Sequence, residues 1–476
     1  MSQWQPISQI AQDVQAGRVT AMSLVEQALK TIDTKHEFSA IIIAITDRAR
    51  ERAKEVDERI AKGEKVGPLA GVPCIVKDNF LTFGVETTAA SNILKGFNAP
   101  YQATVINKLE AAGAIVVAKA NLDAFGHGAS TEHSDFMITK NPHDQTRVPG
   151  GSSGGPAAAV VLDMAPFALG TDTGGSNRQP ASYCGCVGYR PTYGLVSRSG
   201  VVAMASSADT IGPLTKSVDD LAYVLDVIAG KDPLDSTTID RDTAGYQLTA
   251  GNLHLTSQKI GVIKEYMGEG VDPGVKAAVQ SAVSKLQTAG AEVQEISLPS
   301  LPLALAAYYV LVPAEISSNL SRYDGQRYGY SDASVSSLDD SYNQTRSQGF
   351  GQEAKRRIMI GTYVLSSGYY DAYYKKAQKL RTKLINEFTS AFKQVDFLAG
   401  PVAPTTAFKI GEMSSDPLQM FLVDIMTVSA ALAGIPAISL PVGSSNNMPV
   451  GLQFMGPPRS DRALLALSKT AEEVLA

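Results

Sequence analysis

The sequence is poor in cysteine, histidine and tryptophan and has no excess of basic residues. Its 476 residues include 3 Cys, 5 His and 1 Trp, and 42 basic side chains against 47 acidic ones leave a net charge of −5. A long chain with only three cysteines is typical of a reducing compartment. We therefore expect a cytoplasmic protein. The negative charge argues against a broad nucleic-acid surface, and any polynucleotide contact should be local or made by a partner.

Long hydrophobic runs and metal-binding patterns are also missing. No uninterrupted apolar stretch approaches 18 residues, and residues 1–6 show no basic or apolar region of a signal peptide. Cys184 and Cys186 are too close together and too isolated for a zinc site. The histidines are His36, His127, His133, His143 and His254. No spacing among them suits a metal, so we expect neither a structural metal nor a membrane contact.

The chain does have the composition and patterning of a globular α/β protein. It is 44% hydrophobic, which excludes general disorder. Helical spacing begins at Ile7 and again near Val25, where Ser23 and Glu26 form a capping box. Strands are expected at 41–45, 72–76, 115–118, 167–169, 260–263, 293–296, 397–399 and 437–442, and helices at 47–62, 104–112, 217–229 and 273–289. This alternation predicts a mixed, mostly parallel sheet covered by helices on both faces.

Tyrosines concentrate in one part of the chain. Eleven of the 18 lie between residues 308 and 374. Either helices pack there through aromatic contacts, or a helical insertion lines a pocket, because tyrosine combines an apolar ring with a polar hydroxyl. Strand patterns return after this region, and no repeat of 20–50 residues is present. We expect a single domain, residues 1–476, with a tyrosine-rich helical insertion at 300–385.

Two glycine-rich turns are the strongest candidates for chemistry. Residues 149–156 run directly into a helix and contain no lysine, so they form no phosphate loop but present Ser152 and Ser153 at a helix N-terminus. Residues 170–180 follow a short strand, and the paired Gly174 and Gly175 can aim backbone N–H groups at one point, as an oxyanion hole requires. Ser176 follows them directly. A serine nucleophile needs a base, yet no histidine is near in sequence, and the Gly-x-Ser-x-Gly elbow is missing.

Lys77 is the other candidate base. It ends the apolar run 72–76, and a side chain there faces the crevice where parallel sheets bind ligands. Burial would lower its pKa and make it a usable base. A surface lysine at a strand end is the alternative, and the residues alone leave both interpretations open.

Taken together, Lys77 and the segments 150–155 and 172–176 resemble the amidase signature family, and the resemblance extends from about residue 5 to 456. It implies the amidase-signature fold and a Ser–cis-Ser–Lys triad made of Ser176, Ser152 and Lys77. It also implies a cis peptide before Ser152 and an oxyanion hole around Thr173, Gly174 and Gly175.

Further segments favour one branch of this family, the glutamine-hydrolysing A subunits of tRNA-dependent amidotransferases. These segments are 147–149, 190–194, 211–213, 317–325, 355–363 and 368–377. The branch implies that Arg357, Asp424 and Tyr308 contact glutamine. It also implies ammonia transfer to a B subunit that holds tRNA, ATP and Mg²⁺ and converts Glu-tRNA(Gln) to Gln-tRNA(Gln). A C subunit completes the heterotrimer, and this chain needs no cofactor. A stand-alone amidase for another small amide, or an inactive scaffold, are the alternatives.

The sequence departs from the family pattern near the site. Asn177 follows the expected nucleophile where a branched aliphatic residue is usual. Ala124 and His127 stand where the pattern has Glu and Met. We expect Asn177 and His127 to reach the substrate and to influence its selection.

Overall fold

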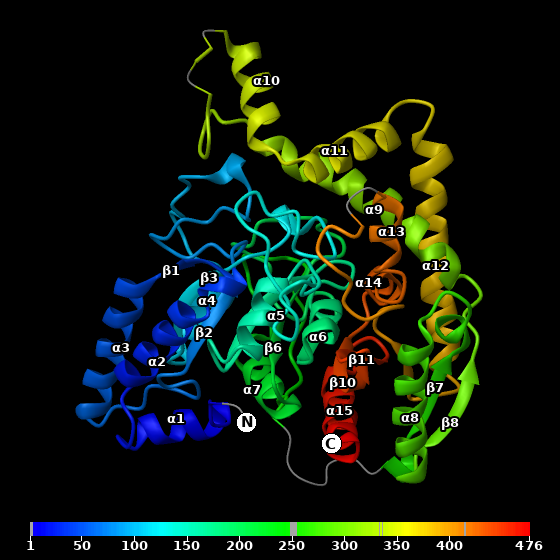
Figure 1. Cartoon of the computed structure of the whole chain (residues 1–476), viewed down its shortest axis with the longest axis horizontal. Coiled ribbons are helices and arrows are strands. Elements are labelled where there is room, and N and C mark those ends of the chain that lie inside the picture. Colours follow the sequence, from blue (N-terminus) through cyan, green and yellow to red (C-terminus); the bar gives the residue numbers. More distant parts are fainter. Residues whose placement is uncertain (1–2, 248–254, 333, 336, 414–415) are drawn as a thin grey trace.

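The computed structural model describes residues 3–247, 255–332, 334–335, 337–413 and 416–476, so His254 lies outside the described residues. These residues form an 11-stranded sheet with the order β1-β3-β2-β4-β6-β5-β10-β11-β9-β7-β8 (Figure 1). The strands are β1 (Ile41–Ala44), β2 (Pro73–Lys77), β3 (Ile115–Ala120), β4 (Phe167–Asp172), β5 (Val187–Arg190), β6 (Thr210–Thr215), β7 (Lys259–Ile263), β8 (Glu292–Ile296), β9 (Phe397–Pro401), β10 (Ala437–Ser445) and β11 (Met448–Met455). Every predicted strand is present.

The sheet is mixed, as predicted, but it is not mostly parallel. Among the described residues, β3, β2 and β4 run parallel to one another, and so do β9, β7 and β8. The remaining six of the ten neighbouring pairs are antiparallel. The expectation failed because β5, β6 and β11 were not recognised in the sequence, and antiparallel pairs can form without an intervening helix.

Helices cover both faces of the sheet. Every residue of β2, β3, β4 and β6 is buried, which requires cover on both sides because successive side chains point to opposite faces. The helices are α1 (Ile7–Gln15), α2 (Ala21–Thr34), α3 (Thr46–Ala61), α4 (Thr104–Ala111), α5 (Gly154–Val161), α6 (Arg178–Cys184), α7 (Val218–Ile228), α8 (Pro273–Thr288), α9 (Ala304–Asn319), α10 (Leu338–Gly349), α11 (Gln352–Leu365), α12 (Lys375–Ala391), α13 (Pro417–Leu422), α14 (Val428–Ala433) and α15 (Asp461–Leu475).

Most predicted helix positions hold to within a residue or two, but the capping box does not. Helix α2 begins earlier than expected, and its N-cap is Thr20, whose side chain accepts a hydrogen bond from the Ser23 N–H at 3.1 Å. Ser23 therefore lies inside the helix. Thr20 and Ser23 are both suitable N-cap residues, so the sequence was compatible with two different first residues for this helix.

The tyrosine-rich region forms helices α9 to α12 (Figure 1). They lie above and beside the sheet, and α10 projects away from the body of the molecule. Tyr308 is buried on α9, whereas Tyr363, Tyr369 and Tyr373 are exposed and contact one another, with ring centroids 4.3–6.1 Å apart. The exposed tyrosines thus pack against one another, as the first interpretation expects, whereas the role of the region as the wall of a pocket stays a prediction.

One helical stretch, Leu301–Arg322, is long and apolar enough to cross a membrane by length and composition alone. It includes α9, and 50% of its apolar window is buried inside the protein. Core helices of soluble proteins pass the same test, and α9 contributes Tyr308, Leu311 and Val312 to the hydrophobic core.

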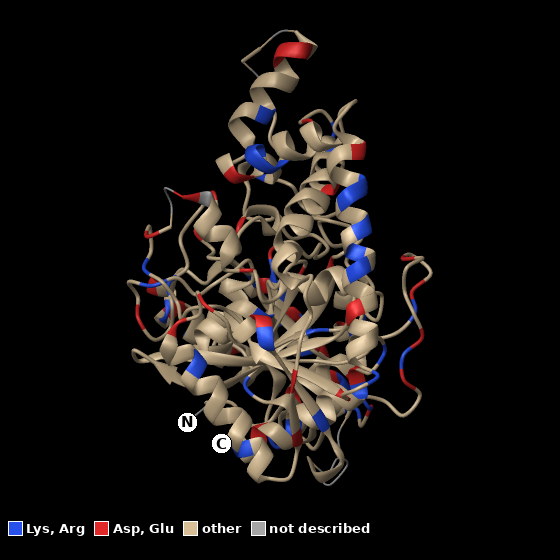
Figure 2. Ribbon diagram, turned by 90° about the vertical axis from the view of Figure 1, so that its right-hand side faces the viewer, with Lys and Arg blue, Asp and Glu red and all other residues tan. Residues whose placement is uncertain are grey.

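Charged residues of both signs are distributed throughout the fold (Figure 2). A stripe of basic residues follows α12, which carries Lys375, Lys376 and Lys379 near its start. The three cysteines are all free thiols and all buried. Burial raises the pKa of Cys186 to about 12 and also raises the pKa of Cys74 and Cys184.

Candidate active site

Lys77 lies at the centre of the site. It is the last residue of β2, is 0% exposed, and its Nζ contacts three hydroxyl groups. Nζ donates to Ser152 Oγ at 2.7 Å, to Ser153 Oγ at 2.9 Å and to Thr171 Oγ1 at 3.0 Å. Lys77 is thus not a surface lysine, and the β2 position brings it to the serine turn 75 residues later.

The surroundings of Lys77 favour its neutral form. Burial lowers the pKa of Lys77 to about 7, although the charges of Asp123, Asp172 and Asp209 act to raise it. No carboxylate accepts a hydrogen bond from Nζ among the described residues. Near neutral pH the amine can therefore accept a proton from a neighbouring hydroxyl.

The serine turn is packed tightly around Ser152. The peptide bond between Gly151 and Ser152 is cis, as the resemblance implied. A side chain at Gly151 would clash with the Asp123 carboxylate, which accepts backbone hydrogen bonds from Thr131 at 2.9 Å and His133 at 3.0 Å. The missing Cβ at position 151 is what lets the turn lie against this carboxylate.

Ser176 lies in the second turn, between β4 and α6. The Ser153 N–H donates to the Ser176 carbonyl oxygen at 3.1 Å, which joins the two turns. The Ser176 hydroxyl has no hydrogen-bond partner among the described residues, and the residue is 8% exposed. Within the same described residues, the backbone N–H groups of Gly174, Gly175 and Ser176 also have no acceptor. The turn therefore presents a free hydroxyl beside free N–H donors, as an oxyanion hole requires.

A buried ion-pair cluster holds this turn in place. Asp172, the last residue of β4, accepts from Arg178 Nε at 3.0 Å and Nη2 at 2.9 Å and from Arg190 Nη1 at 3.1 Å. Burial alone would raise the pKa of Asp172, but the charges and hydrogen bonds of the two arginines lower it to about 2. The carboxylate thus links the end of β4, before Ser176, to α6 and β5, which follow Ser176 in the chain.

The predicted substrate residues come from the tyrosine-rich helices and approach the same turn. The Tyr308 hydroxyl lies against the backbone of Gly174, where an added Cβ would come within 2.6 Å of it. The neighbouring Tyr309 hydroxyl donates to Asp424 Oδ2 at 3.3 Å, and the Arg357 guanidinium lies 5.3 Å from the Tyr309 ring centroid. The structure therefore brings Arg357, Asp424 and Tyr308 together at one side of the serine turns.

Both charged groups are buried but differently held. Arg357 Nε donates to Glu353 Oε1 at 2.8 Å, and within the described part of the chain its two terminal nitrogens have no hydrogen-bond partner. Burial raises the pKa of Asp424 to about 7, while the charge of Arg357 and the hydrogen bond from Tyr309 act to lower it. This half of the site offers a fixed cation and a carboxylate that ionises near neutral pH.

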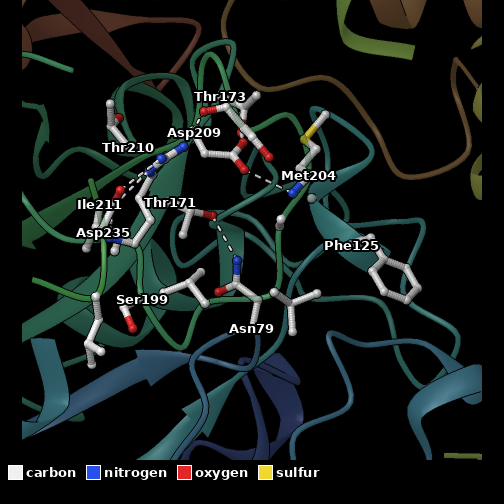
Figure 3. Close-up of a pocket in the computed structure, with 17 residues that line it drawn as sticks. Asn79, Phe125, Thr171, Thr173, Ser199, Met204, Asp209, Thr210, Ile211 and Asp235 are labelled. Carbon is white, nitrogen blue, oxygen red and sulfur yellow. Dashed lines mark hydrogen bonds and ion pairs between the residues drawn. The ribbon is translucent and has the colours of Figure 1, made fainter. Parts of the chain in front are cut away.

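A cavity of about 200 Å³ adjoins the lysine side of the site (Figure 3). Its wall includes Asn79, whose Nδ2 donates to Thr171 Oγ1 at 3.1 Å, and Asp209, which accepts from Thr173 Oγ1 at 2.7 Å. Nowhere in the described ranges do three His, Cys, Asp or Glu side chains gather as a metal site would require.

A family model described as Amidase matches residues 23–465. The chain belongs to the amidase family. Among curated proteins, this amidase is 51% identical to the A subunit of glutamyl-tRNA(Gln) amidotransferase from Geobacillus thermodenitrificans, over 94% of this chain and 93% of that protein. It is 52% identical to the same protein of Thermoanaerobacter pseudethanolicus, over 96% of this chain and 93% of that one. The crystal structure of the Thermotoga maritima counterpart is 42% identical, with a TM-score of 0.78 over 94% of this chain and 90% of that chain.

Several neighbours of the amidase site were not foreseen. Thr171 lies in the turn at 170–180 but was given no role there, and Asp209 carries no motif signal. Tyr309 and Glu353 make contacts that only the fold creates. The expectation for Asn177 was wrong, because its amide is turned into the protein. Asn177 Oδ1 accepts from Ser153 Oγ at 3.0 Å, and Nδ2 donates to the carbonyl oxygens of Tyr189 at 3.0 Å and Gly212 at 3.2 Å.

Proposed function

We propose that this amidase-family enzyme hydrolyses glutamine through a Ser176–Ser152–Lys77 triad. The observation that carries the proposal is the buried Lys77 amine, 2.7 Å from Ser152 Oγ and poised near neutral pKa, behind a turn that exposes the Ser176 hydroxyl. Lys77 accepts the Ser152 proton while Ser152 takes the proton of Ser176. The Ser176 oxygen then forms a bond with the γ-amide carbon.

The oxyanion formed in this step lies at the second turn. The free N–H groups of Gly174, Gly175 and Ser176, next to Thr173, support its stabilisation there. As the carbon–nitrogen bond breaks, the relay runs in reverse and returns a proton to the departing ammonia. Water then cleaves the acyl-enzyme by the same path and releases glutamate.

Glutamine is favoured because the pocket offers opposite charges at one end. The terminal nitrogens of Arg357 suit an α-carboxylate, since a guanidinium can bind it with two hydrogen bonds. Asp424, 3.3 Å from the Tyr309 hydroxyl, suits the α-ammonium group once it is ionised. Tyr308, against Gly174, forms the wall between this end and the reacting amide.

The relatives' names support an assembly around this chain. We place it as the A subunit of a heterotrimer with B and C subunits in the cytoplasm. It passes ammonia to the B subunit, which holds tRNA, ATP and Mg²⁺ and converts Glu-tRNA(Gln) to Gln-tRNA(Gln). This chain itself needs no cofactor for the triad chemistry. The choice between Gln-tRNA and Asn-tRNA as product then belongs to the partner.

We also propose that residues 1–476 work as one domain, with the tyrosine-rich segment 300–385 as an insertion. The strands on either side of that segment support this, because β8 and β9 both pair with β7. The insertion then supplies the substrate end of the site, and the sheet supplies the triad.

The decisive experiment replaces the nucleophile in the assembled enzyme. Ser176→Ala should abolish glutamine hydrolysis, because no other free hydroxyl of the turn can attack, while the circular-dichroism spectrum and the assembly of the heterotrimer stay unchanged. Formation of amidated tRNA from added ammonium chloride should persist, since the partner reaction needs only ammonia. Loss of the ammonia-dependent reaction as well would show that Ser176 has a structural role. Full activity of the wild type on simple amides in the absence of partners would instead favour a stand-alone amidase.

A further inference from the structure

The segment 173–176, which carries the free N–H groups, has a single side-chain hydrogen bond to the described part of the protein. Thr173 Oγ1 donates to Asp209 Oδ1 at 2.7 Å. The two glycines that follow have no side chain, and the Ser176 hydroxyl has no partner in the same described residues. The carboxylate of Asp209 is therefore the side-chain anchor of this turn.

Asp209 is itself held by the backbone of its own loop (Figure 3). Its Oδ2 accepts the Met204 N–H at 3.0 Å, and its Oδ1 accepts the Ala205 N–H at 3.0 Å. Burial raises the pKa of Asp209, whereas these hydrogen bonds and the charge of Arg198 act to lower it. An ionised carboxylate only accepts hydrogen bonds, so it fixes the direction in which the Thr173 hydroxyl points.

The loop that carries Asp209 is fastened to helix α9. Asn319 Nδ2 donates to the Met204 carbonyl oxygen at 3.1 Å, and the Ser207 N–H donates to Glu315 Oε2 at 2.9 Å. Both acceptor and donor groups on α9 thus restrain this loop on the side away from the turn. Because its loop is restrained in this way, Asp209 can hold the turn in place rather than follow its movements.

We propose that Asp209 is a positioning residue for the oxyanion turn and acts through the hydroxyl of Thr173. The inference rests on the proposed Ser176 chemistry and adds the group that keeps the backbone donors aimed at the reacting carbonyl. Donors stabilise an oxyanion best when they are in place before the charge develops. A turn without its anchor should therefore still bind glutamine but react more slowly.

Replacement of Thr173 in the assembled enzyme tests the anchor. Thr173→Val keeps the shape of the side chain without its hydroxyl, so kcat for glutamine should fall about tenfold while KM changes less than about twofold. Thr173→Ser keeps the hydroxyl and should recover most of the lost rate. The matched control is Thr104→Val at the start of α4, which removes a similar hydrogen bond of 2.6 Å to Asp232 and should leave kcat unchanged.

A double-mutant cycle shows whether Asp209 acts through Thr173. In Asp209→Asn, the amide can no longer accept from both Thr173 and Met204, so kcat should again fall about tenfold. If the two residues act as one unit, adding Thr173→Val should lower kcat by less than about another twofold. Independent effects would multiply to about a hundredfold and would overturn the inference.

The pH profile adds a readout that a loosened turn alone would not move. The charge of Asp209 raises the pKa of Lys77, as do the charges of Asp123 and Asp172. Asp209→Asn should therefore shift the acidic limb of the propionamide profile to lower pH, whereas Thr173→Val should leave the limb in place. A shifted limb in Thr173→Val would show that the hydroxyl acts on Lys77 instead of the turn, against the inference.

Two further results separate this inference from the function on which it rests. Wild-type kcat in Thr173→Val, with Ser176→Ala inactive, would exclude the positioning role and leave the proposed triad intact. Glutamine hydrolysis by Ser176→Ala, or none by the wild-type heterotrimer, would refute the proposed function itself. If Asp209→Asn does not fold, the comparison of Thr173→Val with Thr173→Ser still decides the role of the anchor.

Discussion

Lys77 and Asp424 illustrate how burial moves two different side chains towards the same pKa. Burial lowers the pKa of Lys77 to about 7 and raises the pKa of Asp424 to about 7, because in each case it disfavours the charged form. In the proposed mechanism, catalysis needs Lys77 neutral and glutamine binding needs Asp424 ionised. Both conditions are met only above neutral pH. Lowering the pH should therefore reduce glutamine hydrolysis in two ways, by protonating Lys77 and by protonating Asp424.

This coupling predicts a pH profile that depends on the substrate. For glutamine, log kcat/KM should rise with a slope near 2 below pH about 7, because two groups must lose a proton. For propionamide, which has no α-ammonium group, the slope should be about 1. Steady-state kinetics from pH 5.5 to about 9 checks both profiles. Lys77→Arg should be inactive at every pH, since a guanidinium stays protonated; an active Lys77→Arg enzyme would exclude the base role.

The charged pair of the pocket gives a second prediction. Arg357→Ala or Asp424→Ala leaves one charged group of bound glutamine without its partner, a loss that typically costs about 2–5 kcal/mol. We expect kcat/KM for glutamine to fall by orders of magnitude and the slow hydrolysis of propionamide to change little. The comparison of the two amides in each variant is the measurement. Parallel losses on both substrates would indicate a collapsed pocket rather than lost recognition.

At the scale of single residues, the sequence pointed to the two turns and Lys77, but not to the side chains around them. Lys77, Ser152 and Ser176 could be proposed as reacting groups because their segments resemble a known family, and the structure places Lys77 Nζ 2.7 Å from Ser152 Oγ and joins the two turns. The partners that tune them could not. Glu353 and Tyr309 become relevant only once α9 and α11 are packed together, and the direction of the Asn177 amide depends on β5 and β6, which the sequence did not reveal.

Among the elements, strand β4 makes the contacts that hold the Ser176 turn in position. Its last residue, Asp172, meets Arg178 of α6 and Arg190 of β5, and all three side chains are fully buried. Arg178 continues the network to Gln453 of β11 through a hydrogen bond of 2.6 Å. The position of the Ser176 turn thus depends on charges shared among a strand, a helix and the distant end of the chain.

Removing the charge at β4 should therefore destabilise the whole protein. Asp172→Asn keeps the shape but leaves two buried arginines without a counter-charge, which typically costs about 3–5 kcal/mol. We expect the unfolding midpoint in urea to fall accordingly, with hydrolysis reduced even where the protein is folded. The control is Asp240→Asn, at an exposed ion pair with Lys231, where the change should be within about 1 kcal/mol. Equal stability of the two variants would contradict the role of Asp172.

The elements themselves were predictable where one periodicity dominated. Helices α3, α4, α7 and α8 and strands β2, β3, β7 and β8 follow apolar spacing that their sequences display openly. The overall strand directions were not predictable in this way. β10 and β11 pair as antiparallel neighbours, but a pattern of buried residues is the same for a strand in either direction.

In the molecule as a whole, the site is assembled from parts that are distant in sequence. The end of β2 and the turns that precede α5 and α6 supply the proposed triad, and α9 and α11 supply Tyr308 and Arg357. Asp424 lies in the segment between α13 and α14. We therefore expect substrate recognition to depend on the helical layer and amide chemistry to depend on the sheet.

The interior of the molecule also hides all of its thiols. Burial raises the pKa of Cys74, Cys184 and Cys186, so little reactive thiolate forms at neutral pH. The native protein should react with none of them in a colorimetric thiol assay at pH 8 over minutes, and with three equivalents in denaturant. Rapid reaction of any thiol in the native state would show that this core opens.

Because the three native thiols are buried, a single cysteine introduced at the surface can be labelled selectively. A cysteine introduced at the exposed Gln344, on the projecting helix α10, would be the one thiol that a maleimide dye meets first. A fluorophore or spin label attached there would report whether this outlying helix changes its surroundings when glutamine binds or when the B and C chains join the complex. No native cysteine would have to be removed first, so the label would observe the enzyme with its core intact.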